Sequence, residues 1–222
     1  MGESRHNPDQ LLKEIQAGEE NRNKGLLKIF FGYAAGGGKT YAMLEAAHME
    51  KQQGIDVVAG YIEPHARPKT AALLNGLEVL PTREVLYNGM ILNEFDIDMA
   101  LKRKPQIILV DELAHTNAEG CRHAKRYQDI KELLNAGIDV YTTVNVQHIE
   151  SLCDTVASIT EIVVRERIPD SLFDNADQVE LIDIEPQDLI NRLNTGNVYR
   201  QTQAIELSLI HISEPTRRSY IS

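Results

Sequence analysis

The sequence predicts a doubly wound α/β fold, in which helices cover both faces of a mainly parallel sheet. Apolar or β-branched runs of buried-strand length occur at 26–31, 56–62, 107–111 and 138–146, and helical stretches lie between them. A glycine-rich segment joins the first of these strands to a helix. The 222 residues, 42% hydrophobic and 25% charged, are enough to bury the core of one large domain. Alternating strands and helices of this kind form parallel sheets.

The first elements follow from capping signals. Asn7 and Pro8 predict the start of a helix that runs to about Glu19, and a polar linker completes the segment 1–24. The strand at 26–31 ends at Gly32, and the helix expected over 40–53 ends before Gly54.

The remaining elements complete the domain. A helix expected over 124–136, between the strands at 107–111 and 138–146, has its inner face formed by Ile130, Leu133 and Leu134 and ends at Gly137. A later strand at 179–184 and a helix opening near Pro186 follow. We expect one domain over residues 25–206.

The segment 32–40 reads GYAAGGGKT and resembles a phosphate-binding P-loop, so the predicted fold is P-loop NTPase-like. Backbone N–H groups around the loop point at phosphate oxygens, Lys39 neutralises the outer phosphates, and the Thr40 hydroxyl ligates Mg²⁺. The expected ATP-binding positions in the loop are Gly32, Ala35, Gly36, Gly37, Gly38, Lys39 and Thr40. The usual spacing would put the first glycine at position 33, which is Tyr33 here.

The second signal for a nucleotide site is a pair of acidic residues at the end of the strand at 107–111. Asp111 is expected to support Mg²⁺ together with Thr40, through a coordinated water. Glu112 is a candidate catalytic base that polarises water if the site hydrolyses ATP, and it equally fits a carboxylate that only orients a neighbouring loop.

Polar residues after the strands complete the candidate site, because ligands bind at the carboxyl ends of such strands. His115, Thr116 and Asn117 could report the γ-phosphate, and Arg122 or Arg126 could bind phosphate; plain surface structure is an equal alternative for each. Two further clusters face the same crevice or cap helices: Glu63, His65 and Arg67, and Asn145, Gln147 and His148. His115, Cys121 and His123 lack the paired spacing of a zinc site.

Composition and the termini exclude other classes. A net charge of −10 argues against a general nucleic-acid binder. No apolar run approaches the roughly 20 residues that cross a bilayer, and the N-terminus lacks a secretion signal. We therefore expect a cytoplasmic chain that makes no membrane contact itself.

Beyond the P-loop, the segments most specific for a single protein family are the blocks DELAHTN at 111–117 and TTVNVQH at 142–148. With their flanking residues they resemble the N-terminal cytoplasmic domain of the KdpD family, potassium- and turgor-responsive sensor histidine kinases, over about residues 5–200. The shifted glycine agrees with that family. Tyr33 and Lys69 depart from its pattern, which has a small residue and Glu at those positions.

The resemblance implies an ATP- and Mg²⁺-binding regulatory domain. Its nucleotide state would bias the kinase and phosphatase activities of a transmitter domain that acts on a response regulator of potassium uptake. The chain shows no transmitter, so we expect a fragment or short form. Residues 207–217 read LSLIHISEPTR, which resembles a translated sequencing adapter, and 207–222 are expected to be a non-native tail.

Two alternatives belong to other classes. One is a free-standing P-loop ATPase or small-molecule kinase, with Glu112 as base and the segment 122–126 as an arginine-bearing lid. The other is a nucleotide-free interaction module in which Tyr33 fills the phosphate site.

Overall fold

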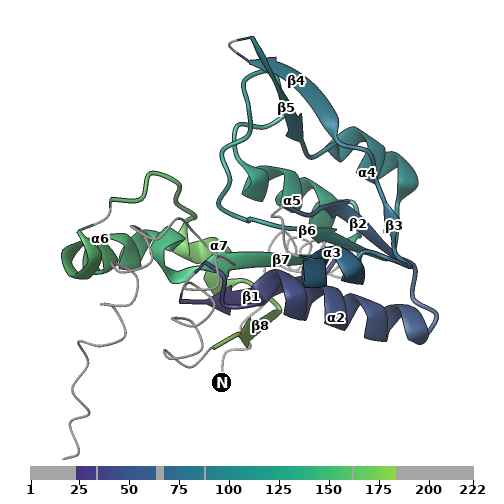
Figure 1. The fold of residues 1–222 in the computed structure, drawn as a ribbon, viewed down its shortest axis with the longest axis horizontal. Helices are drawn as coiled ribbons and strands as arrows, with labels where there is room; N and C mark the ends of the chain where they lie inside the picture. The colour runs from purple at the N-terminus through teal and green to yellow at the C-terminus, as the bar shows by residue number, and fades with distance from the viewer. Residues whose placement is uncertain (1–23, 34, 64–67, 88, 162, 184–222) are drawn as a thin grey trace, which may run out of the picture.

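A six-stranded sheet forms the centre of the part of the chain that the computed structural model describes, residues 24–33, 35–63, 68–87, 89–161 and 163–183 (Figure 1). Its strand order is β3-β2-β6-β7-β1-β8, and every neighbouring pair is parallel. The strands are β1 (Leu27–Gly32), β2 (Val57–Tyr61), β3 (Glu78–Val79), β6 (Ile107–Val110), β7 (Asp139–Asn145) and β8 (Gln178–Leu181). The predicted α/β class with a parallel sheet is confirmed.

Helices lie on both faces of this sheet (Figure 1). They are α2 (Lys39–Gln52), α3 (Pro68–Leu73), α4 (Ile97–Arg103), α5 (Arg126–Asn135), α6 (Glu150–Thr160) and α7 (Asp170–Asp174), with a 3₁₀ turn η1 (Val146–His148). Because successive side chains of a strand point to opposite faces, β1 feeds two cores: Ile29 packs with the α5 side and Phe30 with the α2 side.

The predicted elements within the described residues agree with the structure to within one to three residues at their ends. The strands near 26–31, 56–62, 107–111, 138–146 and 179–184 correspond to β1, β2, β6, β7 and β8, and the two predicted helices to α2 and α5. The N-terminal helix, the helix near Pro186, the tail, His65 and Arg67 lie outside the described residues.

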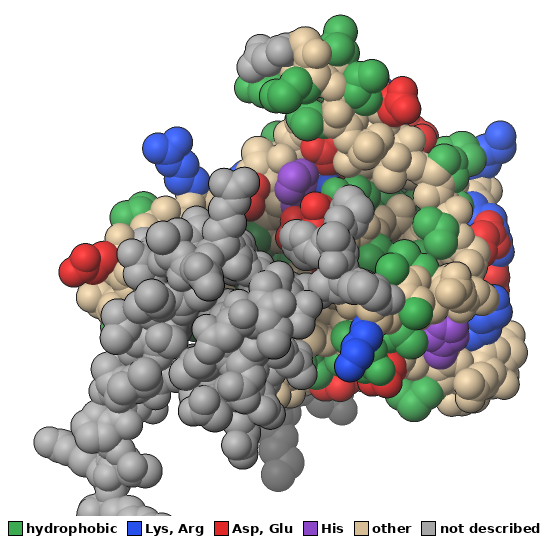
Figure 2. Space-filling model, viewed as in Figure 1, with side chains coloured by type: hydrophobic (Ala, Val, Ile, Leu, Met, Phe, Trp, Pro, Cys, Tyr) green, Lys and Arg blue, Asp and Glu red, His purple; other side chains and the backbone are tan. Residues whose placement is uncertain are grey.

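An antiparallel hairpin of β4 (Arg83–Tyr87) and β5 (Met90–Glu94) stands out from the sheet (Figure 1). Leu86, Met90 and Ile91 are exposed on it, and hydrophobic side chains gather at this projecting end in Figure 2. The hairpin was not predicted, because exposed apolar residues on both of its faces remove the alternation that marks a half-buried strand. The Asn-Gly pair at 88–89, typical of tight hairpin turns, was the available signal.

Among the described residues, no helix combines the length and the apolar character that a bilayer crossing requires.

Candidate functional site

The loop between β1 and α2 has the backbone geometry that its glycines permit. Gly36 has φ 86° and Gly38 φ 101°, in the left-handed region that side chains disfavour. Gly38 is the N-cap of α2, and no side chain caps the helix there. The positive end of the α2 dipole therefore faces the loop, as in an anion-binding site.

Lys39 is largely buried, with 8% of its surface exposed, and its stem runs beside Gly32. A Cβ atom at Gly32 would lie 3.1 Å from Lys39 Cδ and 3.0 Å from the backbone oxygen of Ile182. The glycine one position earlier than usual thus leaves room for the lysine stem.

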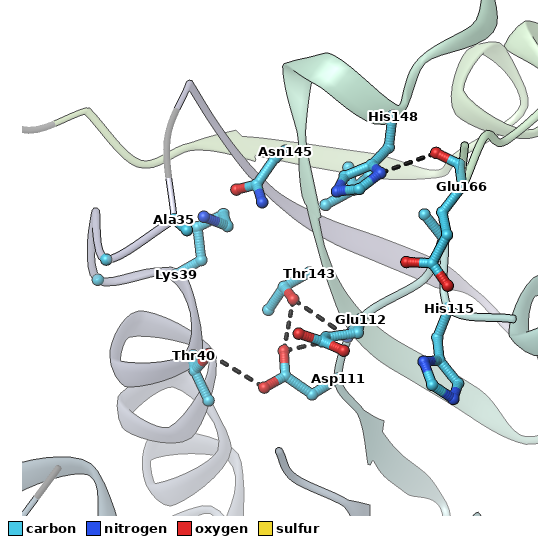
Figure 3. Close-up of a pocket in the computed structure, with 14 residues that line it drawn as sticks. Ala35, Lys39, Thr40, Asp111, Glu112, His115, Thr143, Asn145, His148 and Glu166 are labelled. Carbon is cyan, nitrogen blue, oxygen red and sulfur yellow. Dashed lines mark hydrogen bonds between the residues drawn. The ribbon is translucent and has the colours of Figure 1, made fainter. Parts of the chain in front are cut away.

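Asp111 lies at the carboxyl end of β6, buried, between two hydroxyl groups. Thr40 Oγ1 donates to its Oδ2 at 3.1 Å, and Thr143 Oγ1 from β7 donates to its Oδ1 (Figure 3). Neighbouring ligands of an octahedral Mg²⁺ at about 2.1 Å lie about 3 Å apart, so the spacing of the Thr40 and Asp111 oxygens suits this ion even without the water that was expected between Asp111 and the metal. The oxygen-only donor pair also fits a hard cation.

Glu112 follows in a strained conformation, with φ 59° at a residue other than glycine. Burial, together with the negative charges of Asp111 and Glu63, raises the pKa of its carboxyl to about 7. A carboxylate with this pKa can accept a proton near neutral pH.

These groups line one cavity of about 360 Å³, a size within the usual range of ligand pockets (Figure 3). Its lining includes the predicted residues Ala35, Gly36, Gly38, Lys39, Thr40, Asp111, Glu112 and His115, and also Asn145 and His148.

Eight of the described candidate residues do not line the cavity: Gly32, Gly37, Glu63, Thr116, Asn117, Arg122, Arg126 and Gln147. The Asn117 amide donates to Asp129 at 2.6 Å. The Arg122 guanidinium pairs with Asp98 at 2.6 Å and Glu132 at 2.5 Å, so two carboxylates hold it on the surface. Arg126 is fully buried and bound to Glu94. The sequence did not reveal these partners, because they come from other elements.

Tyr33 does not line the cavity either; its side chain is exposed and its ring lies 6.3 Å from that of Phe31. The nucleotide-free reading required Tyr33 to fill the phosphate site, and this geometry does not support it.

Two polar residues of the cavity lining, Thr143 and Glu166, are not predicted from the sequence. Thr143 belongs to the TTVNVQH block, in which the sequence alone assigns no role to the threonines. Glu166 comes from the segment after α6 and had no local signal. Its Oε1 accepts the Thr116 N–H at 2.8 Å, and its backbone oxygen accepts His148 Nδ1–H at 2.8 Å. Glu166 thereby joins the loop after β6 to η1.

Asn145 and His148, at and after the end of β7, bring hydrogen-bond acceptors to the cavity. Burial lowers the pKa of His148, with Lys39 contributing, so its ring is neutral near pH 7; Nδ1 is the donor and Nε2 the acceptor. Asn145 Oδ1 is buried and has no hydrogen-bond partner within the described structure. The cavity therefore combines the Lys39 cation with uncharged acceptors on Asn145 and His148.

Comparisons with known proteins agree on one family. The model of the KdpD family, described as "Osmosensitive K+ channel His kinase sensor domain", matches residues 23–214. The chain is 62% identical over 199 residues to a sensor protein KdpD of Clostridium acetobutylicum and 54% identical over 200 residues to that of Escherichia coli K12, covering 90% of this chain and 22% of each relative. A putative sensor protein KdpD of Synechocystis sp. PCC 6803 is 51% identical, covering 80% of this chain and 48% of the relative.

The chain thus spans about a fifth of the length of the first two relatives. Among solved structures, a DNA replication initiation factor superposes with a TM-score of 0.40 at 13% identity, over 90% of this chain and 55% of that chain, which is too distant to inform the site.

Proposed function

The chain belongs to the KdpD family of osmosensitive K⁺ channel histidine-kinase sensor domains, and on that premise we propose that it is an ATP-binding regulatory domain. In this proposal ATP with Mg²⁺ occupies the cavity. The nucleotide state then sets the balance of kinase and phosphatase activities in a transmitter domain elsewhere in the full-length protein. The response regulator of potassium uptake is reached through that transmitter, and the domain works on the cytoplasmic side of the membrane.

One observation carries the proposal: the Thr40 hydroxyl lies 3.1 Å from the buried Asp111 carboxylate, directly beside Lys39 and the left-handed Gly38. This arrangement supplies a cation for phosphates, backbone donors at a helix N-terminus and oxygen ligands for Mg²⁺. When bound, the metal would neutralise phosphate charge, and Thr40 and Asp111 would hold it.

The loop after Asp111 is the candidate reader of nucleotide state. His115 lines the cavity, and the next residue is tied to Glu166, which lines it as well. A γ-phosphate that contacts His115 would therefore bias the position of the whole loop.

Calorimetric titration of the full chain with ATP and Mg²⁺ tests this proposal. Lys39→Ala should weaken binding at least about tenfold, because it removes a charge-assisted contact with phosphate. Lys102→Ala, an exposed lysine on α4, is the matched control and should bind as the wild type does. A folded wild-type chain that binds no ATP, or Lys39→Ala with unchanged affinity, would contradict the proposal.

Slow ATP hydrolysis is a second candidate function, favoured by the placement of Glu112 in the cavity beside Asp111. Glu112→Gln should then abolish phosphate release while ATP still binds. Release at the wild-type rate from this variant would exclude Glu112 as the base. A small-molecule kinase is less well supported, because neither Arg122 nor Arg126 lines the cavity as a lid residue would.

A further inference from the structure

Glu94, the last residue of the projecting hairpin, is buried among donors from other elements, with 4% of its surface exposed. His115 Nε2 lies 3.2 Å from both of its carboxylate oxygens, and the backbone N–H of Ala118 donates to Oε1 at 3.0 Å. Arg126 donates to Oε2 at 3.0 Å. Burial alone would raise the pKa of Glu94, but these partners outweigh it and hold the pKa below its usual value, so the carboxylate is charged.

Arg126 carries the contact from the hairpin to the candidate metal site. Its guanidinium is fully buried, stacks over the Tyr61 ring at 4.1 Å, and donates through Nη1 to the backbone oxygen of Asp111 at 3.2 Å. Its own backbone N–H donates to the oxygen of His115 at 3.0 Å. One side chain thus touches both the hairpin carboxylate and the residue expected to hold Mg²⁺.

The peptide group between Asp111 and Glu112 is held at both of its polar atoms. Arg126 binds its oxygen, while its N–H donates to Asp111 Oδ1 at 3.2 Å and to Thr143 Oγ1 at 3.3 Å. The next torsion is the strained φ of 59° at Glu112. A residue other than glycine keeps such a conformation only where surrounding contacts hold it there. The hydrogen bond from Arg126 is one of those contacts.

We propose that Glu94 is a positioning residue for the Mg²⁺–nucleotide site: through Arg126 it fixes the Asp111–Glu112 peptide and with it the Asp111 carboxylate. The proposal rests on the proposed function of ATP binding. It assigns to the hairpin a role in setting metal-dependent affinity, although none of the hairpin's described residues lines the cavity.

The stability of the fold alone does not require the ion pair between Glu94 and Arg126. A buried carboxylate and guanidinium lose hydration, and well-packed apolar residues are often as stabilising as such a pair. The hairpin has separate anchors, since Arg83 contacts the oxygen of Gly120 at 3.4 Å and Asp98 at 3.7 Å. What the pair adds is directional contact with the Asp111 backbone.

The test compares ATP affinity with Mg²⁺ and with EDTA for the full chain. Glu94→Gln should reduce the gain in affinity from Mg²⁺ about tenfold, as loss of a group behind a metal ligand does, while the affinity in EDTA changes little. Glu84→Gln, an exposed glutamate on the same hairpin, is the matched control and should keep the full gain. A general structural defect would lower both affinities together.

Glu94→Gln leaves the Arg126 charge buried without its carboxylate, which is expected to lower the stability of the variant, so a second variant replaces the whole pair. The double variant Glu94→Gln with Arg126→Met removes both charges and should also lose the Mg²⁺-dependent gain. An undiminished gain in either folded variant overturns the proposal.

A wild-type chain that binds no ATP would refute the proposed function instead, and hydrogen exchange without ligand then tests the positioning role. The Glu112 and Leu113 amides should exchange faster in Glu94→Gln than in Glu84→Gln, because their hydrogen bonds depend on the fixed peptide. Equal exchange rates in these two variants would overturn the positioning role by themselves.

Discussion

Replacing Gly32 by alanine tests whether the early glycine of the loop serves the lysine stem. The new Cβ would lie 3.1 Å from Lys39 Cδ and 3.3 Å from Lys39 Cγ, so the stem must move by a few tenths of an ångström. A charge-assisted hydrogen bond contributes about 1.5–3 kcal/mol. Partial loss of the lysine–phosphate contact, about 1 kcal/mol, corresponds to about fivefold weaker ATP binding.

The assay is calorimetric titration with ATP and Mg²⁺, beside thermal melts that establish folding. Gly89→Ala is the matched control: Gly89 has φ 79°, and its added Cβ would meet no described atom within 4 Å apart from its chain neighbours, so alanine there is strained but does not touch the site. It should lower stability by about 1 kcal/mol and leave ATP affinity unchanged. Wild-type affinity in folded Gly32→Ala would refute the steric argument for the shifted glycine.

Two further predictions concern stability. Burial raises the pKa of Asp129 to about 6 from 3.8, so the native state binds its proton more tightly than the unfolded state, and the free energy of unfolding falls as pH rises from about 4 to about 6. In urea denaturation, the free energy of unfolding of Asp129→Asn should not show this fall, so its advantage over wild type should grow by on the order of 2 kcal/mol between pH 4 and 7. A difference between the two proteins that does not change with pH would contradict this prediction. Gly60→Ala would place a Cβ 2.7 Å from Ile108 Cδ1 and 2.9 Å from Phe95 Cε2, and should destabilise the chain by about 1–3 kcal/mol. An unchanged denaturation midpoint would show that the core accommodates the methyl group.

Local signals predicted the central elements of the fold well. A buried parallel strand reads as a short apolar run, and a glycine after it marks the turn into a helix, so β1 and α2 were readable without tertiary information. The segment from α3 to α4 was not readable in this way. Its elements are short, and most side chains of the hairpin within it are exposed, so no continuous buried face imposes a period of two.

The candidate site divides along the same line. Lys39 and Thr40 lie in one contiguous motif, and Asp111 ends an apolar strand, so their residue types and spacing already predicted a shared role. The fate of Arg122 could not be predicted, because its partners Asp98 and Glu132 come from α4 and α5. The local sequence around a surface arginine is the same whether its guanidinium binds phosphate or two carboxylates.

By itself, then, the sequence determined the α/β class and the family and predicted a phosphate-binding loop, because strand runs, glycine turns and blocks such as DELAHTN are each short contiguous patterns. Only the tertiary structure decided which distant side chains complete the site. The parallel register of β6 and β7, with Val110 opposite Thr142, brings Thr143 to Asp111, and the return of the chain after α6 brings in Glu166. Glu94 reaches Arg126 from a hairpin 32 residues away. Such contacts arise from packing between elements, and no local pattern of residues encodes them.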